Sequence, residues 1–294
     1  MKKLVLFLLP LFIGAYACSP KFDLAKSKQQ GKTEYTAGNY RAALQSWENI
    51  IAWHKENKPE IPGEIFAEAG KAAYRLGNTE KAEKYFKQAG WAGYDDPEMY
   101  RMMAEMYRNM DNLSKELEAL ESYVENYPEG DSILPMKKRL FQTYVISENW
   151  EPGTELYRSF SDSLQNTEEM LEGWFNIQEE LDNEEEATGA ARQLLLVDED
   201  NAMALEFLAK KYFWKAENLY QEELEAYNKN KTHKQYRRLL NALDRVNADF
   251  KVALEYFKQL YEQEAKKEYA RYIGNIYIRF DDKKTAEYWY GLAE

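Results

Sequence analysis

The sequence predicts an all-α fold, a solenoid of about eight antiparallel helix pairs. Three observations lead to this prediction: large and small residues recur in one pattern along the chain, turn-forming residues separate the repeated segments, and no linker rich in Gly, Ser or Pro interrupts the array. Repeats with periods of roughly 20–50 residues are typical of solenoids, in which each unit buries its apolar face by stacking on the next. Because such an array is a surface for holding another molecule, we expect binding rather than chemistry.

The clearest copy of the repeat covers residues 66–89. Small residues at Gly70 and Ala82 allow two helices to approach closely, and Phe66 and Phe86 fill the space around that contact. The pattern resembles the tetratricopeptide repeat (TPR), a helix–turn–helix unit of about 34 residues. One position that the family fills with a small residue marks seven units, at Ala43, Ala82, Glu116, Gly153, Ala187, Ala253 and Ala286. The resemblance covers residues 24–294 and implies a right-handed superhelical solenoid.

The units follow one another in order along the chain. The first has Gly31 and Trp47, the third runs over residues 100–123 before Pro128, the fourth and fifth cover 140–160 and 171–194, and the last covers 273–290. Turn residues separate the paired helices, at Gly38-Asn39, Gly77-Asn78, Asp111-Asn112, Glu148-Asn149, Asp182-Asn183 and Asp281-Asp282. Pro62, Pro97 and Pro135 stand near helix starts, where the missing N–H costs little.

One unit, at about 202–233, is irregular. The markers Ala187 and Ala253 are 66 residues apart, which is two periods, so a unit lies between them. Its first helix is supplied by Leu205, Leu208 and Tyr212, but its second helix does not match the pattern. Apolar residues keep helical spacing as far as residue 227 without Gly or Pro. We therefore predict a degenerate unit that could be one long or kinked helix.

The N-terminus does not follow the repeat. Lys2 and Lys3 precede an apolar run over residues 4–17, whose 14 residues fall short of the roughly 20 that span a bilayer as a helix. This arrangement is typical of a secretory signal peptide, which we assign to residues 1–17. A buried N-terminal helix is the alternative.

Cys18, the only cysteine of the chain, follows this segment. Residues 15–18 resemble the lipobox of bacterial lipoproteins, although Leu is usual where Ala15 stands and a small residue where Tyr16 stands. The resemblance implies a diacylglycerol thioether on Cys18, a short tether over residues 18–23 and, because Ser19 rather than Asp comes next, a Gram-negative outer membrane location facing the periplasm. Ordinary cleavage that leaves Cys18 as a free thiol is the alternative.

The charge balance bears on the partners. The chain has 39 Lys and Arg against 51 Asp and Glu, a net charge of −12, and loses two more positive charges with Lys2 and Lys3. This acidity argues against a nucleic-acid partner, which needs a basic footprint.

The resemblance places the first helix of each pair along an inner groove, with unit positions 5, 9, 12 and 13 pointing into it. In the seven clear units the basic residues at these positions are Lys28, Lys32, Lys71, Arg75, Arg101, Arg108, Lys138, Arg238, Arg245, Arg271 and Arg279, and the acidic ones are Glu105, Glu172, Glu179 and Glu180. A basic groove in an acidic chain would attract an acidic peptide or domain. Alternatively, the aliphatic parts of these side chains cover the contacts between helices, and their charged ends pair with nearby Glu.

Two further features of the sequence bear on binding. A second basic cluster comprises Lys229, Lys231, His233, Lys234, Arg237 and Arg238. We interpret it as a solvated loop, with a phosphate or lipid-headgroup site as the alternative. The Lys/Asn clamp by which some TPR proteins bind C-terminal carboxylates is not supported, because Lys71 and Glu105 stand where Asn is needed.

Carboxylates are abundant, but the sequence contains no motif that points to catalysis or to metal binding. His54 and His233 are far apart, so no metal-ligand set follows from them, and no phosphate loop or Ser nucleophile motif appears. We expect no enzymatic activity, metal or cofactor. The favoured function is a lipid-anchored scaffold or adaptor in the cell envelope that holds an unknown, acidic protein partner. The alternative is a glycan-binding lipoprotein of a nutrient-uptake system.

Overall fold

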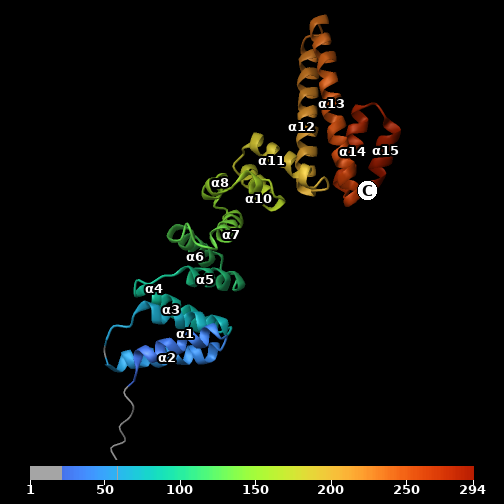
Figure 1. The fold of residues 1–294 in the computed structure, drawn as a ribbon. Helices are drawn as coiled ribbons and strands as arrows, with labels where there is room; N and C mark the ends of the chain where they lie inside the picture. Colours follow the sequence, from blue (N-terminus) through green and yellow to red (C-terminus); the bar gives the residue numbers. More distant parts are fainter. Residues whose placement is uncertain (1–21, 58) are drawn as a thin grey trace, which may run out of the picture. The chain divides into compact units, whose positions relative to one another are not determined.

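The computed structural model describes residues 22–57 and 59–294, and over these residues the chain forms fifteen helices and no strand. The all-α prediction is therefore confirmed (Figure 1). The predicted signal peptide, the lipidation at Cys18 and most of the tether lie outside the described residues. Asp23, the last residue assigned to the tether, caps the first helix, since its carboxylate accepts a hydrogen bond from the N–H of Lys26 at 3.0 Å.

The helices divide into two compact units, one ending at Ile133 and the other covering Leu134–Glu294. In the first unit, α1 (Leu24–Thr36) pairs with α2 (Tyr40–Asn57), α3 (Gly63–Arg75) with α4 (Thr79–Trp91), and α5 (Pro97–Asn109) with α6 (Leu113–Asn126). The second unit holds nearly all of α7 (Ile133–Ile146), followed by α8 (Trp150–Arg158), α9 (Asp162–Gln165), α10 (Glu168–Glu180), α11 (Glu184–Val197), α12 (Ala202–Lys229), α13 (His233–Gln263), α14 (Lys267–Arg279) and α15 (Lys283–Leu292).

The turns inside the helix pairs repeat one hydrogen-bond pattern. In the second pair, the N–H of Asn78 bonds the carbonyl of Ala73 at 3.0 Å and the N–H of Gly77 bonds that of Tyr74 at 2.8 Å, which is a Schellman ending. Gly77 has a φ of 73°, and the side chain of Asn78 then caps α4 by accepting from the N–H of Lys81. The predicted Gly-Asn and Asp-Asn turns are thus a helix ending joined directly to a helix start.

Glycine on the first helix admits an aromatic ring from the second. A Cβ atom built on Gly31 would lie 2.7 Å from the ring of Trp47, and one built on Gly70 would lie 2.6 Å from the ring of Phe86. Both rings are fully buried. The same contact recurs in the last pair between Gly274 and Tyr290, at 2.6 Å. The recurrence of small and large residues in the sequence therefore corresponds to the packing between the two helices of each pair.

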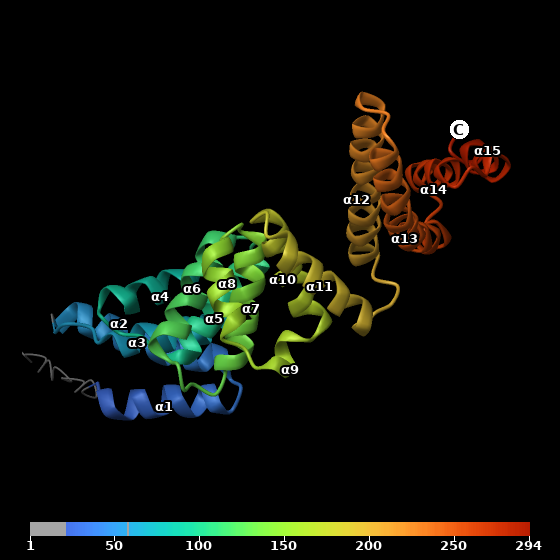
Figure 2. The ribbon, with the colours of Figure 1, turned by 90° about the horizontal axis from the view of Figure 1, so that it is seen from above.

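The irregular region departs from the predicted number of units. Where two units were expected between residues 202 and 263, α12 and α13 form a single hairpin of two long helices, which lie side by side in Figures 1 and 2. The described residues therefore make seven hairpins rather than about eight. Two separate helix pairs do not form here, because Val246, Phe250 and Ala253 continue the helical spacing of α13 and are buried against α12. The prediction of one long helix over 205–227 is confirmed.

None of the helices in the described part of the chain is long and apolar enough to cross a membrane.

Candidate binding groove

The candidate site lies in the second unit, along the first helices of its last three hairpins, α10, α12 and α14. A cavity of about 810 Å³ lies between α10, the start of α11, and α12. A second cavity of about 500 Å³ lies between α12 and α14 and reaches Tyr290 of α15. Trp214 on α12 lines both, so the two cavities form one groove, which we call the Trp214 groove.

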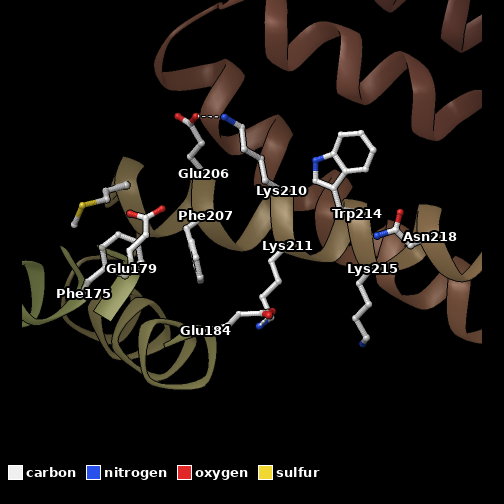
Figure 3. A pocket seen from close by; sticks show the side chains of 11 residues that line it. Phe175, Glu179, Glu184, Glu206, Phe207, Lys210, Lys211, Trp214, Lys215 and Asn218 are labelled. Atoms are coloured by element: carbon white, nitrogen blue, oxygen red, sulfur yellow. Dashed lines mark hydrogen bonds and ion pairs between the residues drawn. The ribbon is translucent and has the colours of Figure 1, made fainter. Parts of the chain in front are cut away.

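The first cavity has an apolar floor and a balanced charged rim (Figure 3). The rings of Phe175 and Phe207 meet edge to face, with 5.0 Å between their centroids. Lys210 pairs with Glu206 at 2.5 Å and Lys211 pairs with Glu184. Three Lys and three Glu side chains line this cavity, so it carries no net positive charge.

The periodicity of α12 sorts the side chains that line the first cavity onto two sides of the helix. In Figure 3, Glu206, Lys210 and Trp214 share one side of the helix, while Phe207 and Lys211 lie on the other, toward α10 and α11. Residues four apart lie on the same face of a helix, and of these five residues Trp214 alone also lines the second cavity. Lys210 also pairs with Glu268 of α14 at 3.3 Å, which ties α12 to the next hairpin.

The second cavity is aromatic with a fixed ion pair at its edge. Phe213 and Tyr272 meet edge to face at 4.8 Å. The Nε and Nη2 groups of Arg279 each donate a hydrogen bond to the carboxylate of Glu217. Burial, the largest single influence, would raise the pKa of the Glu217 carboxyl, but the hydrogen bonds from Arg279 and Gln221 and the charge of Arg279 together hold that pKa below its ordinary value.

Arg271 differs from the other cations of the groove. It is exposed, it lines the second cavity, and it has no ion-pair partner among the residues that the structure describes. An unpaired guanidinium beside aromatic side chains can bind a carboxylate through two parallel N–H···O hydrogen bonds.

Trp214 is the most exposed large apolar residue of the groove, with 50% of its surface accessible. Its neighbour Phe213 is buried and holds the indole edge to face at 5.3 Å between ring centroids. The indole is therefore positioned by the core without being covered by it. Tryptophan in such a setting is the residue type most often found at the energetic centre of protein interfaces.

Most of the predicted groove cations are paired with acids. Eight of the eleven have a carboxylate within ion-pair distance in the described part of the chain: Lys28, Lys32, Lys71, Arg75, Arg101, Lys138, Arg238 and Arg279. Arg108, Arg245 and Arg271 have no such partner among these residues. The alternative interpretation, pairing with nearby Glu, thus describes most of this set, and a partner-binding role for these residues stays a prediction.

In the first unit the ion pairs connect successive first helices. Glu64 of α3 lies 3.6 Å from Lys28 and 3.0 Å from Lys32 of α1. Lys71 of α3 is 6% exposed and lies 2.7 Å from Asp96, the N-cap residue of α5. Burial lowers the pKa of the Lys71 ammonium, but Glu68 and Asp96 more than offset this and raise the pKa above its ordinary value. Lys71 is therefore a structural residue rather than an exposed groove cation.

Two predicted groove residues are misplaced. Arg238 and Arg245 were assigned to the first helix of a unit, but both lie on α13, the second helix of its hairpin, and line a separate hollow. The cause is that residues 233–263 form one helix, α13, which pairs with α12 as the second helix of the hairpin. Of the predicted acids, Glu179 lines the first cavity, and Glu172 accepts a hydrogen bond from Asn201 at 3.0 Å.

The residues that the groove prediction missed come from the irregular unit. Taking Ala202 as its first residue, unit positions 5, 9, 12 and 13 are Glu206, Lys210, Phe213 and Trp214, and all four line the groove. The same positions in the last unit are Arg271, Asn275, Ile278 and Arg279, which line the second cavity. Applying the positional rule to the irregular unit as well would have found Trp214.

Comparisons with known proteins agree with this architecture. A protein from Bacteroides ovatus, provisionally described as protein-binding, superposes with a TM-score of 0.50 at 18% identity, over 76% of this chain and 100% of its own. The C-terminal part of a TPR protein from Cytophaga hutchinsonii and a TPR protein from Parabacteroides merdae each cover 92% of this chain, with TM-scores of 0.47 and 0.43 at 12% and 13% identity and 94% and 91% of their own lengths.

The chain has an all-α helical-repeat fold. At these identities the likeness concerns the fold alone. No protein-family model matches the sequence, and no curated protein matches it either.

Proposed function

We propose that this protein is an interaction scaffold that holds a segment of a partner protein in the Trp214 groove. The observation that carries the proposal is the half-exposed indole of Trp214, which stands between two cavities on the helix face that TPR-type folds turn toward their ligands. Large clefts with an apolar floor and a few oriented polar groups are where proteins bind their ligands.

The lining indicates what the partner segment presents to the groove. An apolar or aromatic side chain would pack on Trp214, with Phe207 on one side and Tyr272 on the other. The Lys and Glu side chains of the rim already neutralise one another, so the groove favours a segment of mixed charge over a strongly acidic one. Arg271 offers one position for a partner carboxylate.

We further propose that the scaffold is lipid-anchored in the cell envelope through Cys18, facing the periplasm. The support is the basic start, the apolar run over residues 4–17 and the single Cys that follows. Intact-mass measurement of the protein extracted from membranes tests this. A mass increment that corresponds to acylation and disappears in Cys18→Ser supports the anchor, and an unmodified thiol contradicts it.

The groove is tested by quantitative affinity capture from native membranes with wild-type and Trp214→Ala protein as bait. Trp91→Ala is the matched control, because Trp91 is 82% exposed, lies on α4 in the first unit and lines neither cavity of the groove. We expect Trp214→Ala to lose the partner that the wild type and Trp91→Ala recover. Truncation of a central interface tryptophan typically costs about 2 kcal/mol or more, which is roughly 30-fold in affinity.

Equal recovery by all three baits contradicts the proposal. Glycan-array binding by the purified protein that is lost in Trp214→Ala would also contradict it, and would favour the glycan-binding alternative at the same site.

A further inference from the structure

A second surface, separate from the Trp214 groove, lies at the outer end of the hairpin of α12 and α13. The large buried cluster of this region ends at Ala216 on α12 and Val246 on α13, and among residues 217–245 only Glu223, Leu239 and Ala242 are buried. Between these positions the two helices pack mainly on each other, and Figure 1 shows their outer halves side by side with α14 and α15 against the inner half of α13. Residues 217–245 therefore form an extension whose outer faces are exposed.

Basic side chains gather on one face of this extension. His233, Lys234, Arg237, Arg238, Asn241 and Arg245 line a shallow hollow of about 490 Å³, and all six belong to α13. Sequence reasoning placed this cluster in a solvated loop, and this is wrong for His233 to Arg238, which form the first two turns of α13. The helix aligns the cations on one face, since they recur at intervals of three and four residues.

Three of these cations are not neutralised. Arg238 lies 2.8 Å from the buried Glu223 of α12 and is thereby fixed within the hairpin. Lys234, Arg237 and Arg245 are exposed and have no ion-pair partner among the residues that the structure describes. Like charges on neighbouring turns repel one another, so this arrangement lowers stability unless an anion covers it.

Apolar side chains lie beside the cations on the same helix. Tyr236 is 47% exposed and Leu240 is 44% exposed, and they are four residues apart, so they share one face. The ring of Tyr236 rests against that of Tyr227, with 5.8 Å between centroids. A basic face next to an exposed apolar face is the pattern of a helix that lies at a membrane surface.

We propose that the tip of the α12–α13 hairpin docks on an anionic lipid bilayer. Lys234, Arg237 and Arg245 would contact phosphate-bearing headgroups, and Tyr236 and Leu240 would enter the boundary between headgroups and acyl chains. The hollow is lined by one helix and has no second wall to hold a peptide, whereas a bilayer needs contact from one side only. The net charge of −12 would keep the rest of the chain off such a surface, so the tip is the part suited to the contact.

Vesicle flotation tests the proposal, using the full chain with Cys18→Ser in every variant so that no acyl chain at residue 18 contributes. The probes are vesicles of phosphatidylcholine alone and vesicles that also contain phosphatidylglycerol. The test variant is Lys234→Ala/Arg237→Ala/Arg245→Ala. The matched control is Lys26→Ala/Arg41→Ala/Lys55→Ala, which removes the same charge from exposed residues that also lack ion-pair partners in the described part of the chain.

We expect wild-type protein to bind the anionic vesicles preferentially and less well at high salt. Each cation near an anionic surface contributes roughly five-fold, so the test variant should lose roughly 100-fold while the control stays within about two-fold. Tyr236→Ser/Leu240→Ser should weaken binding to the same vesicles at high salt as well, where screening leaves the apolar contribution.

Binding of the test variant within two-fold of wild type overturns the proposal, as does equal binding of wild type to both kinds of vesicle. Binding of wild type to an immobilised polyglutamate peptide but not to anionic vesicles, with the peptide binding lost in the test variant, also overturns it and assigns the surface to an acidic protein instead.

Discussion

The ammonium group of Lys71 lies 2.7 Å from a carboxylate oxygen of Asp96, and this pair joins the first helices of two successive hairpins, α3 and α5. Lys71 is 6% exposed and also lies 3.0 Å from Glu68 and 3.7 Å from Glu98, so four charges meet at this joint. Asp96 uses its other carboxylate oxygen to cap α5 through the N–H of Met99. One cluster therefore fixes both the start of a helix and the stacking of one repeat on the next.

We predict that Lys71→Met destabilises the first unit by about 3 kcal/mol, because it leaves Glu68 and Asp96 facing each other without a cation in a buried position. Urea unfolding followed by circular dichroism measures this. Lys87→Met is the control: Lys87 is exposed and pairs with Glu83 four residues away on the same helix, and Glu83 keeps Lys115 as a second partner, so its loss should cost about 0.5 kcal/mol or less. Similar losses for both variants would show that the buried cluster has no special role.

Glu83 should make the stability of the first unit depend on pH. Lys115 at 2.6 Å, and then Lys87, lower the pKa of the Glu83 carboxyl from 4.5 to about 2 in the folded chain. Because the folded pKa is depressed, the stabilisation is present above the unfolded pKa and is lost as the pH falls from about 4.5 to about 2. Solvent screening limits it to about 1 kcal/mol or less.

The check is urea unfolding of wild type and Glu83→Gln at pH 5 and at pH 2.5. The difference in unfolding free energy between the two proteins should shrink on going to the lower pH. A constant or growing difference would mean that Lys115 and Lys87 do not lower this pKa.

Two glycines on one helix pair should respond oppositely to alanine. A Cβ atom on Gly70 of α3 would lie 2.6 Å from the ring of Phe86, so Gly70→Ala should destabilise by about 1–3 kcal/mol. A Cβ atom on Gly90 of α4 meets nothing within 4 Å, so Gly90→Ala should stabilise by up to about 1 kcal/mol through helix propensity. Thermal unfolding of the two variants decides this, and the packing account fails if Gly70→Ala raises the melting temperature.

Local sequence signals predicted the parts of the fold that local interactions determine. The turns could be predicted from the Gly-Asn and Asp-Asn pairs. A residue with positive φ and a capping side chain end one helix and start the next through contacts within about six residues along the chain. The single hairpin of α12 and α13 was not predicted, because what stabilises α13 as one helix is the packing of Phe250 on α12, a distant segment of the chain.

The candidate site was predicted only in part, for a related reason. The position of Arg271 and Arg279 in the groove follows from the repeat, and the structure places both there. The neutralisation of Arg279 does not follow from the repeat, since Glu217 is 62 residues from Arg279 and is brought to it by the packing of α12 with α14. Trp214 was missed because the unit that carries it deviates from the repeat pattern, not because its position is unusual.

Site-specific photo-crosslinking tests the Trp214 groove most directly. A benzoylphenylalanine placed at Ile278 would project from the second cavity, and the same residue placed at Tyr288 would lie exposed on α15, outside it. In cells that produce the protein at native levels, we predict a discrete adduct from the Ile278 position that Trp214→Ala abolishes, and none from the Tyr288 position. An adduct that persists in Trp214→Ala, or equal adducts from both positions, would contradict a partner held in this groove.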